Sequence, residues 1–336
     1  MQPKRSAIKI QDVAREAGVS VSTVSRVLNG KVDVAKDTQD RILTVIDELG
    51  YSSSLAARSM RSLRTNVIGL VMPDVEHPFS IEIMKGVNRA ITESPFDLLV
   101  YTTGNVRKYA AANHERRFVA QLNNSITDGV IIVASANASI FLDKPVVSVD
   151  PHTIDPNYPS IYGTNYAGAM EAMEYLLELG HRRIGFIAGR PELESATQRL
   201  LGYKDALKKW GVAIDESLIA NGDFSMPVSI LAAKQILSLL ERPSAIFAAN
   251  DQSAIGVFEA ARDMNLLIPE DLSVIGFDNI TEANYINLTT VDQFLSEMGS
   301  KATRMLIKII NDEPLENRIH QIRTKLIVRG SCQRNN

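Results

Sequence analysis

Residues 8–30 read IKIQDVAREAGVSVSTVSRVLNG, and this stretch decides how the chain begins to fold. Its first apolar residues recur at helical spacing, at Ile10, Val13, Ala14 and Ala17. The spacing predicts a short helix over 11–17, which Gly18 ends because glycine readily supplies a turn. Ser20 then stands at the N-cap of a second helix, predicted over 21–28. Two short helices joined by a glycine-containing turn predict a helix-turn-helix, whose second helix enters the major groove of DNA.

The apolar faces of these helices predict a small closed core. In the second helix the apolar side chains are expected on one face, at Val24, Val27 and Leu28. A third helix is predicted over 36–49 and would bury four apolar residues against the first two helices, namely Ile42, Val45, Ile46 and Leu49. The three helices are therefore expected to form an all-α DNA-binding domain over 1–51.

The same run resembles, almost position by position, the head of the lac repressor/gal repressor family, and the resemblance continues through Tyr51 and along the rest of the chain. It implies a sequence-specific transcription regulator, in most cases a repressor. By this resemblance Val21 and Ser22 read base edges, and Arg26 donates to a guanine. Other positions match residues that contact phosphates and fix the register on the duplex, namely Ser20, Thr23, Ser25, Asn29 and Tyr51.

Two details of the head qualify this resemblance. Arg26 could instead form a surface ion pair with Asp12 or Glu16, which would take it away from DNA. Ala35 stands where relatives often place a serine cap for the third helix. Because alanine has no side-chain acceptor, we expect that helix start to be weaker by about 1 kcal/mol.

Residues 52–65, SSSLAARSMRSLRT, are predicted to form a hinge. Helices shorter than about 12–15 residues are marginal in water, so this segment is expected to order only against a partner. The family resemblance implies a hinge helix over the minor groove, with Ala57 and Met60 facing the groove and Met60 wedging into a base step. The alternative is a disordered linker, and both states are compatible with the sequence.

The charge distribution supports a DNA-binding head. Residues 1–64 contain 11 Lys or Arg and 7 Asp or Glu, a net charge of +4, whereas the remainder carries −7. A basic module on an acidic body is typical of proteins that neutralise phosphates. The single cysteine, Cys332, rules out a disulfide framework within one chain.

From Val67 onward, apolar runs alternate with amphipathic segments. The predicted strands are VIGLVMPD, DLLVYTTGN, GVIIVASAN, PVVSVDP, RIGFIAGR, SAIFAAND and LSVIGFDN. The predicted helices cover 80–93, 109–123, 166–179, 196–210, 227–240 and 254–264. Continuous Val/Ile/Leu runs followed by helices predict parallel strands buried on both faces. We therefore expect an α/β body of two doubly wound parallel sheets, similar to periplasmic binding proteins.

Polar residues follow most of these strands, at the edge where open parallel sheets bind ligands. Asp74 and Asp251 are expected to cap the next helices, whereas Asp278 is expected to contact a ligand. The family resemblance implies that Arg199, Asn250 and Asp278 form the polar clamp on a small-molecule effector. It adds secondary polar and aromatic contacts, at Ser135, Asp150, Gln293, Phe224 and Phe79. Arginine and aspartate can each bridge two adjacent hydroxyl groups, which suits a saccharide, but the aromatic side chains could equally hold a purine.

The resemblance also sets the expected boundaries of the body, 66–336. One lobe is expected over about 66–164 and 294–324, and the other over about 165–293 and 325–336. Crossovers are expected near Asn165, Phe294 and Thr324, with 295–310 returning to the first lobe as a helix. Since no leucine heptads follow Arg329, we expect a homodimer that binds a pseudo-palindromic operator in double-stranded DNA.

These features together predict a cytoplasmic repressor of carbohydrate-utilisation genes, controlled by a sugar bound between the lobes. A repressor that uses a purine or another non-sugar metabolite as corepressor is the first alternative, and a sugar-transport component is the second. A sugar-transport component would not account for the basic head, and the N-terminus does not resemble a secretory signal. No phosphate loop, GxSxG or GxGxxG motif occurs. The histidines show no metal-ligand spacing, so neither an enzyme, nor a membrane protein, nor a metal or cofactor is expected.

Overall fold

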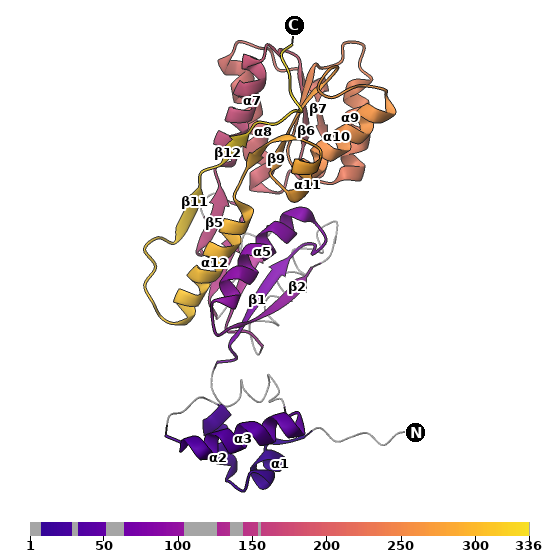
Figure 1. Cartoon of the computed structure of the whole chain (residues 1–336). Helices are drawn as coiled ribbons and strands as arrows, with labels where there is room; N and C mark the ends of the chain where they lie inside the picture. The colour runs from indigo at the N-terminus through magenta and orange to yellow at the C-terminus, as the bar shows by residue number, and fades with distance from the viewer. Residues whose placement is uncertain are drawn as a thin grey trace. The chain divides into compact units, whose positions relative to one another are not determined.

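The computed structural model describes residues 8–28, 33–51, 64–103, 126–134, 144–153 and 156–335. The chain divides into two compact units, Met1–Thr65 and Asn66–Asn336 (Figure 1). Among the described helices, none is both long enough and apolar enough to cross a membrane. The predicted helix over 109–123 lies outside the described residues.

The described part of the first unit contains three helices, α1 (Ile10–Glu16), α2 (Val21–Leu28) and α3 (Lys36–Leu49). Its core consists of side chains from all three helices and the first turn, namely Ile10, Val13, Ala14, Ala17, Val24, Val27, Ile42 and Val45. Gly18 has a φ of +65°, the left-handed conformation that lets the chain turn between α1 and α2. Leu28, expected on the apolar face of α2, is instead 38% exposed and does not belong to this core.

The capping hydrogen bonds at the N-termini of α2 and α3 depend on whether the N-cap residue has a side-chain acceptor. The Ser20 hydroxyl accepts a hydrogen bond from the Thr23 backbone N–H at 3.1 Å, as an N-cap does. Ala35 is the N-cap residue of α3 and provides no side-chain hydrogen bond. The backbone N–H groups of the first turn of α3 therefore lack the side-chain acceptor that a serine would have offered.

The second unit contains two six-stranded sheets. The first has the strand order β11-β5-β4-β3-β1-β2 and is parallel throughout. Its strands are β1 (Val67–Met72), β2 (Asp97–Thr102), β3 (Gly129–Val133), β4 (Val146–Val149), β5 (Ser160–Gly163) and β11 (Ile319–Ile322). Helices α5 (Pro78–Thr92) and α12 (Leu295–Ile310) lie side by side and cover this sheet (Figure 1). We call this sheet with its helices lobe 1.

The second sheet has the order β12-β10-β9-β8-β6-β7 and is parallel except for β12, which runs antiparallel to β10. Its strands are β6 (Ile184–Ala188), β7 (Ile219–Asn221), β8 (Ala245–Ala248), β9 (Ser273–Asp278), β10 (Thr289–Asp292) and β12 (Lys325–Ile327). Its helices are α7 (Asn165–Glu178), α8 (Glu194–Lys209), α9 (Met226–Leu237), α10 (Asp251–Asp263), α11 (Thr281–Tyr285) and the 3-10 turn η1 (Glu216–Leu218). We call this part lobe 2. The chain passes between the lobes three times, after β5, after β10 and after β11.

This architecture confirms the predicted fold class: an N-terminal all-α helix-turn-helix followed by two doubly wound, mostly parallel sheets. Apolar runs predicted the buried strands well, since β1 and β3 are buried at every position. Five short strands were missed, namely β5, β7, β10, β11 and β12. They have only three or four residues each, and several contain polar residues such as Thr289 and His320, so they show no apolar run.

Close packing between α5 and α12 depends on glycine. A Cβ atom on Gly86 of α5 would overlap the backbone oxygen of Ser296 in α12. We therefore expect Gly86→Ala to destabilise the protein by about 1–3 kcal/mol, the usual cost of overpacking. Asn88→Ala, at an exposed position of the same helix, is the control and should change stability by less than about 0.5 kcal/mol. Urea unfolding of the two variants checks this, and equal stability would contradict the close packing.

Candidate functional site

The head presents one exposed face of α2. Val21, Ser22 and Arg26 are exposed, whereas Val24 and Val27 are buried in the core. Positions 22 and 26 are four residues apart and therefore lie on the same side of the helix. The hydroxyl group of Ser20 lies 2.7 Å from that of Ser22 and 2.8 Å from that of Thr23. This face combines hydroxyl groups with one guanidinium, the groups that contact phosphates and guanine.

The remaining candidates of the head divide into two groups. Ser25 and Tyr51 are partly buried, and Tyr51 packs against the core of the head. Asn29, Ala57 and Met60 lie outside the described residues, as does Ser135 of the body.

The pairing of Arg26 differs from the alternative expected from the sequence. Its Nη1 atom lies 3.2 Å from Oδ2 of Asp33. Asp12, one of the two expected partners, instead pairs with Arg15 three residues along α1. This pairing is local because residues at i and i+3 face each other on a helix.

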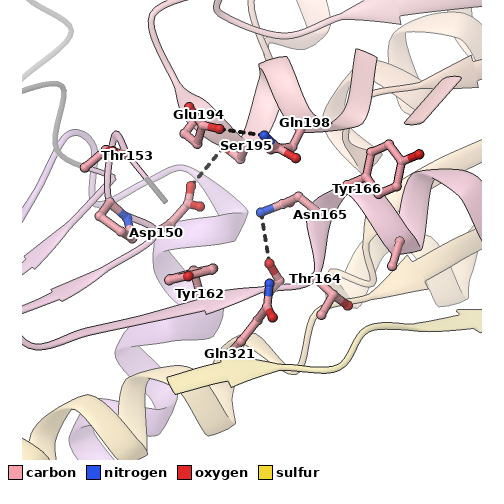
Figure 2. A pocket seen from close by; sticks show the side chains of 13 residues that line it. Asp150, Thr153, Tyr162, Thr164, Asn165, Tyr166, Glu194, Ser195, Gln198 and Gln321 are labelled. Carbon is pink, nitrogen blue, oxygen red and sulfur yellow. Dashed lines mark hydrogen bonds between the residues drawn. The ribbon is translucent and has the colours of Figure 1, made fainter. Parts of the chain in front are cut away.

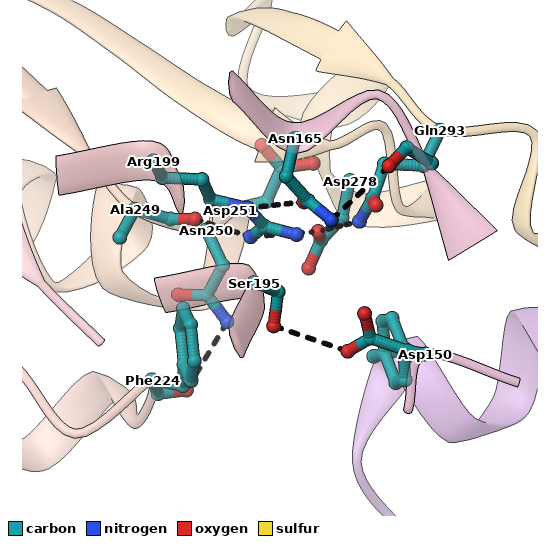
Figure 3. A network of polar contacts seen from close by, with 12 residues as sticks. Asp150, Asn165, Ser195, Arg199, Phe224, Ala249, Asn250, Asp251, Asp278 and Gln293 are labelled. Carbon is teal, nitrogen blue, oxygen red and sulfur yellow. Dashed lines mark hydrogen bonds and ion pairs between the residues drawn. The ribbon is translucent and has the colours of Figure 1, made fainter. Parts of the chain in front are cut away.

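In the body, Arg199 of α8 is the centre of a buried polar network (Figure 3). Its Nε donates to the side-chain oxygen of Asn165 at 2.9 Å, and its Nη1 donates to the backbone oxygen of Ala249 at 2.5 Å. Nη1 also lies 3.4 Å from Oδ1 of Asp278, at the end of β9. The guanidinium carbon is 3.9 Å from the ring centre of Phe277, so the charge lies over an aromatic face. Arg199 is thus fixed from several sides.

Asp278 and Gln293 complete this network. The Gln293 amide donates to Oδ1 of Asp278 at 2.6 Å. Both side chains are almost completely buried, at 4% and 2% exposure. Arg199 and Gln293, both implied by the family resemblance, therefore contact the same oxygen of Asp278, and Asp278 and Gln293 lie at the carboxyl ends of β9 and β10.

A second group of contacts lies around Phe224, in the loop after β7. The Asn250 amide donates to the Phe224 backbone oxygen at 3.2 Å, while its own oxygen caps α10 by accepting from Ser253 N–H. The Phe224 ring centre is 5.6 Å from the Arg199 guanidinium carbon. Nε2 of His77 in lobe 1 lies 3.3 Å from the same Phe224 oxygen. This contact bridges the lobes through a residue to which the family resemblance gave no role.

The Ser195 hydroxyl joins Asp150 of lobe 1 to α8 of lobe 2, donating to the carboxylate at 3.1 Å. Both residues line a pocket of about 220 Å³ (Figure 2). The pocket also contains polar side chains from β5, α7 and β11, namely Tyr162, Asn165 and Gln321, together with Thr153 and Gln198. Asn165, which accepts a hydrogen bond from Arg199, also lines this pocket, so the pocket adjoins the Arg199 network and offers hydroxyl, amide and carboxyl groups.

Backbone strain coincides with three of the candidates. Asp150, Phe224 and Asp278 have φ angles of 53°, 57° and 116°. Non-glycine residues with positive φ cost about 1–3 kcal/mol each and cluster at ligand sites. Because the strain falls on residues that also face one network, we interpret it as the cost of orienting their side chains.

Carboxyl groups outnumber basic groups in this region. Burial raises the pKa of Asp278 to about 7, although the neighbouring Arg199 works against this rise. Burial likewise raises the pKa of Asp150 and Asp251, and lowers that of Arg199. Among the described residues that face this network, three carboxyl groups share one guanidinium. Burial thus favours neutral groups here, so the region suits an uncharged ligand that can form hydrogen bonds.

Two expected helix caps were wrong. Asp251 does not cap α10, since Asn250 does; its carboxylate is fully buried and accepts from Ile280 N–H and from the Thr290 hydroxyl. Asp74 accepts from Glu76 N–H in a turn, and His77 caps α5. The cap therefore falls one residue before Asp251 and three residues after Asp74, a shift that residue type alone does not reveal.

Among the described effector candidates, Phe79 is the one that the contacts do not connect with the other candidates. Its side chain packs against the lobe 1 core, and its backbone N–H donates to His77 at 3.3 Å. Conversely, Asn165 and Ser195 join the network but were not expected as site residues. Ser195 lies four positions before Arg199 on α8, so helical spacing could have revealed it. Within the described ranges, no group of three His, Cys, Asp or Glu residues could hold a metal ion.

The raised pKa of Asp278 predicts how stability depends on pH. The folded chain holds a proton that the unfolded chain releases near the usual carboxyl pKa, so stability should fall as pH rises from about 4 to about 7. One such proton gives a slope of at most about 1.4 kcal/mol per pH unit. Asp278→Asn should flatten the fall, as urea unfolding at pH 5, 6, 7 and 8 would measure. Equal slopes in the two proteins would show that Asp278 is ionised throughout.

Comparison with known proteins supports both the helix-turn-helix head and the two-lobed body. Residues 9–54 match the family model described as bacterial regulatory proteins, lacI family, and residues 173–332 match a periplasmic binding protein-like domain. The chain is 32% identical to the HTH-type transcriptional repressor PurR of Vibrio atlanticus, over 96% of this chain and 98% of that protein. It is 34% identical to the ribose operon repressor of Halalkalibacterium halodurans, over 96% and 97%.

A solved structure has the same architecture. The transcriptional regulator CelR in complex with cellobiose superposes with a TM-score of 0.72 at 29% identity, covering 96% of this chain and 99% of that one. The similarity thus extends over both units of the chain.

Proposed function

The chain belongs to the lacI family of bacterial regulatory proteins and is a DNA-binding transcriptional repressor, and from this premise we propose that a sugar bound at the Arg199–Asp278 network controls its affinity for an operator. The observation that carries the proposal is this buried clamp at the carboxyl ends of the strands, beside three residues with strained backbones. Strands of an open parallel sheet place ligands at this edge.

The chemistry of the site favours a neutral saccharide. Asp150 lines the pocket and Asp278 lies in the adjoining network, and their carboxyl oxygens can accept from hydroxyl groups of a sugar. The Phe224 ring, beside Arg199, provides an apolar surface for the C–H face of a sugar. Burial disfavours a charged group at this position. The ribose operon repressor and the cellobiose complex, both named after sugars, support the same class. A purine remains the alternative ligand, since Phe224 could stack on a base.

Contacts between the lobes supply a physical basis for control. The Thr281 hydroxyl of lobe 2 donates to Glu82 of lobe 1 at 2.8 Å, and Lys85 lies 3.2 Å from the same hydroxyl. The His77–Phe224 and Ser195–Asp150 contacts also cross between lobes. A ligand that binds among these groups changes the balance between lobe arrangements, and by thermodynamic linkage DNA and effector then alter each other's affinity.

The proposed regulator acts as a homodimer in the cytoplasm and represses carbohydrate-utilisation genes. Two copies of the helix-turn-helix would bind two half-sites of a pseudo-palindromic operator, because a two-fold symmetric protein matches a two-fold symmetric site.

The test begins with duplexes selected by the full-length protein from a random-sequence pool. Their affinity is then measured with and without ribose, cellobiose, hypoxanthine and guanine. We expect a sugar to change operator affinity by about 5-fold to 150-fold, the usual range of allosteric coupling. A response to a purine alone would replace the sugar assignment, and equal affinity with every compound would contradict effector control at this site.

A further inference from the structure

The base-reading face of the head contains an acidic partner for its arginine. Nη1 of Arg26, in the last turn of α2, lies 3.2 Å from Oδ2 of Asp33, which precedes α3. The two side chains are 61% and 51% exposed. The contact therefore lies at the surface of the head, on the side chain that would read a guanine.

Stability of the fold does not explain this pair well. Exposed ion pairs contribute about 0–1 kcal/mol, because water screens the charges and ordering two side chains costs entropy. The three helices already share an apolar core that includes neither residue. An exposed carboxylate beside DNA is also unfavourable, since it approaches the phosphates. A benefit to DNA recognition would offset this repulsion.

The geometry of the guanidinium provides such a benefit. An arginine binds a guanine through two parallel N–H donors directed at O6 and N7. The contact with Asp33 uses Nη1, so Nε and Nη2, which form the other edge of the same plane, can still make this bidentate contact. A carboxylate on one edge fixes the plane of the other edge. It also opposes rotation of the side chain toward a phosphate, where Arg26 would bind without reading sequence.

We propose that Asp33 is a positioning residue for operator recognition, which holds Arg26 by one edge so that the other edge selects guanine. The inference rests on the proposed DNA-binding role of Arg26. Asp33 would thus raise the specificity of operator binding and lower the affinity for nonspecific DNA.

The test compares full-length wild type with Asp33→Ala, Asp33→Glu and Asp37→Ala in selection from random-sequence duplexes. Asp37 is exposed in the first turn of α3, so its replacement removes the same charge from the same domain without removing the partner of Arg26. The base pair read by Arg26 is identified as the one whose preference disappears in Arg26→Ala.

At that base pair, we expect Asp33→Ala to reduce the preference for guanine by up to about fivefold, the limit set by an exposed ion pair. Asp33→Glu should restore part of it, and Asp37→Ala should leave it unchanged. Both alanine variants should bind nonspecific duplex more tightly at low salt, since each removes one negative charge. An unchanged or increased guanine preference in Asp33→Ala would overturn the proposal. If the wild type enriches no sequence at all, the proposed function fails first, and this inference fails with it.

Discussion

Replacing Asp278 by alanine should remove the response to effector while leaving effector-free operator affinity within about twofold of wild type, a difference of about 0.4 kcal/mol. The carboxylate is the group of the clamp that can accept two hydrogen bonds from one ligand. At pH 8, above the pKa of about 7 to which burial raises Asp278, hydrogen bonds to its charged form contribute about 1.5–3 kcal/mol each, so the loss of two should weaken effector binding by more than about 100-fold. Operator affinity measured by fluorescence anisotropy, with and without the active sugar, gives the result.

The same substitution leaves the hydrogen bonds of Arg199 to Asn165 and to the Ala249 backbone oxygen in place. The fold should therefore persist, and Asp278→Asn, which keeps the shape of the side chain, provides a second variant. Asp263→Ala removes an exposed carboxylate of the same lobe, paired with Lys234, and is the control. A normal effector response in Asp278→Ala would exclude this carboxylate from the site. Loss of operator binding in both Asp278 variants but not in Asp263→Ala would instead assign Asp278 a structural role.

The sequence predicted the helices and strands correctly where the spacing of apolar residues alone determines them. In the head, buried residues spaced three and four apart predicted α2 and α3 correctly, because each helix has a single neighbouring core to face. In the body, apolar runs predicted the strands that are buried on both faces. They failed for short strands such as β5 and β12, which are defined by hydrogen bonds to neighbouring strands rather than by their own composition.

The site was predictable only as a set of residue types. The resemblance brought Arg199, Asp278 and Gln293 together, and the structure places them in direct contact. It did not predict that the side-chain oxygen of Asn250 caps α10, nor that the Ser195 hydroxyl joins the two lobes. Such contacts depend on how loops from different strands meet, and sequence spacing carries little information about that arrangement.

Replacing Arg26 by alanine should remove most of the preference for operator over random DNA and retain nonspecific binding that weakens with salt. A bidentate arginine–guanine contact discriminates by about 1–3 kcal/mol at each half-site, so a dimer should lose at least about thirtyfold in specificity. Nonspecific affinity comes from the other basic residues of the head and from phosphate contacts. The slope of log affinity against log salt should therefore change by about one unit or less per head.

Arg15→Ala is the matched control, because Arg15 is an exposed arginine of the same domain and pairs with Asp12 within α1. Both variants remove one positive charge, so their nonspecific affinities should decrease alike, while operator preference should decrease only in Arg26→Ala. Equal preference in the two variants would mean that the exposed face of α2 contributes charge and no sequence reading. Another element of the head would then have to contact the bases, and the assignment of Val21 and Ser22 to base edges would fall with that of Arg26.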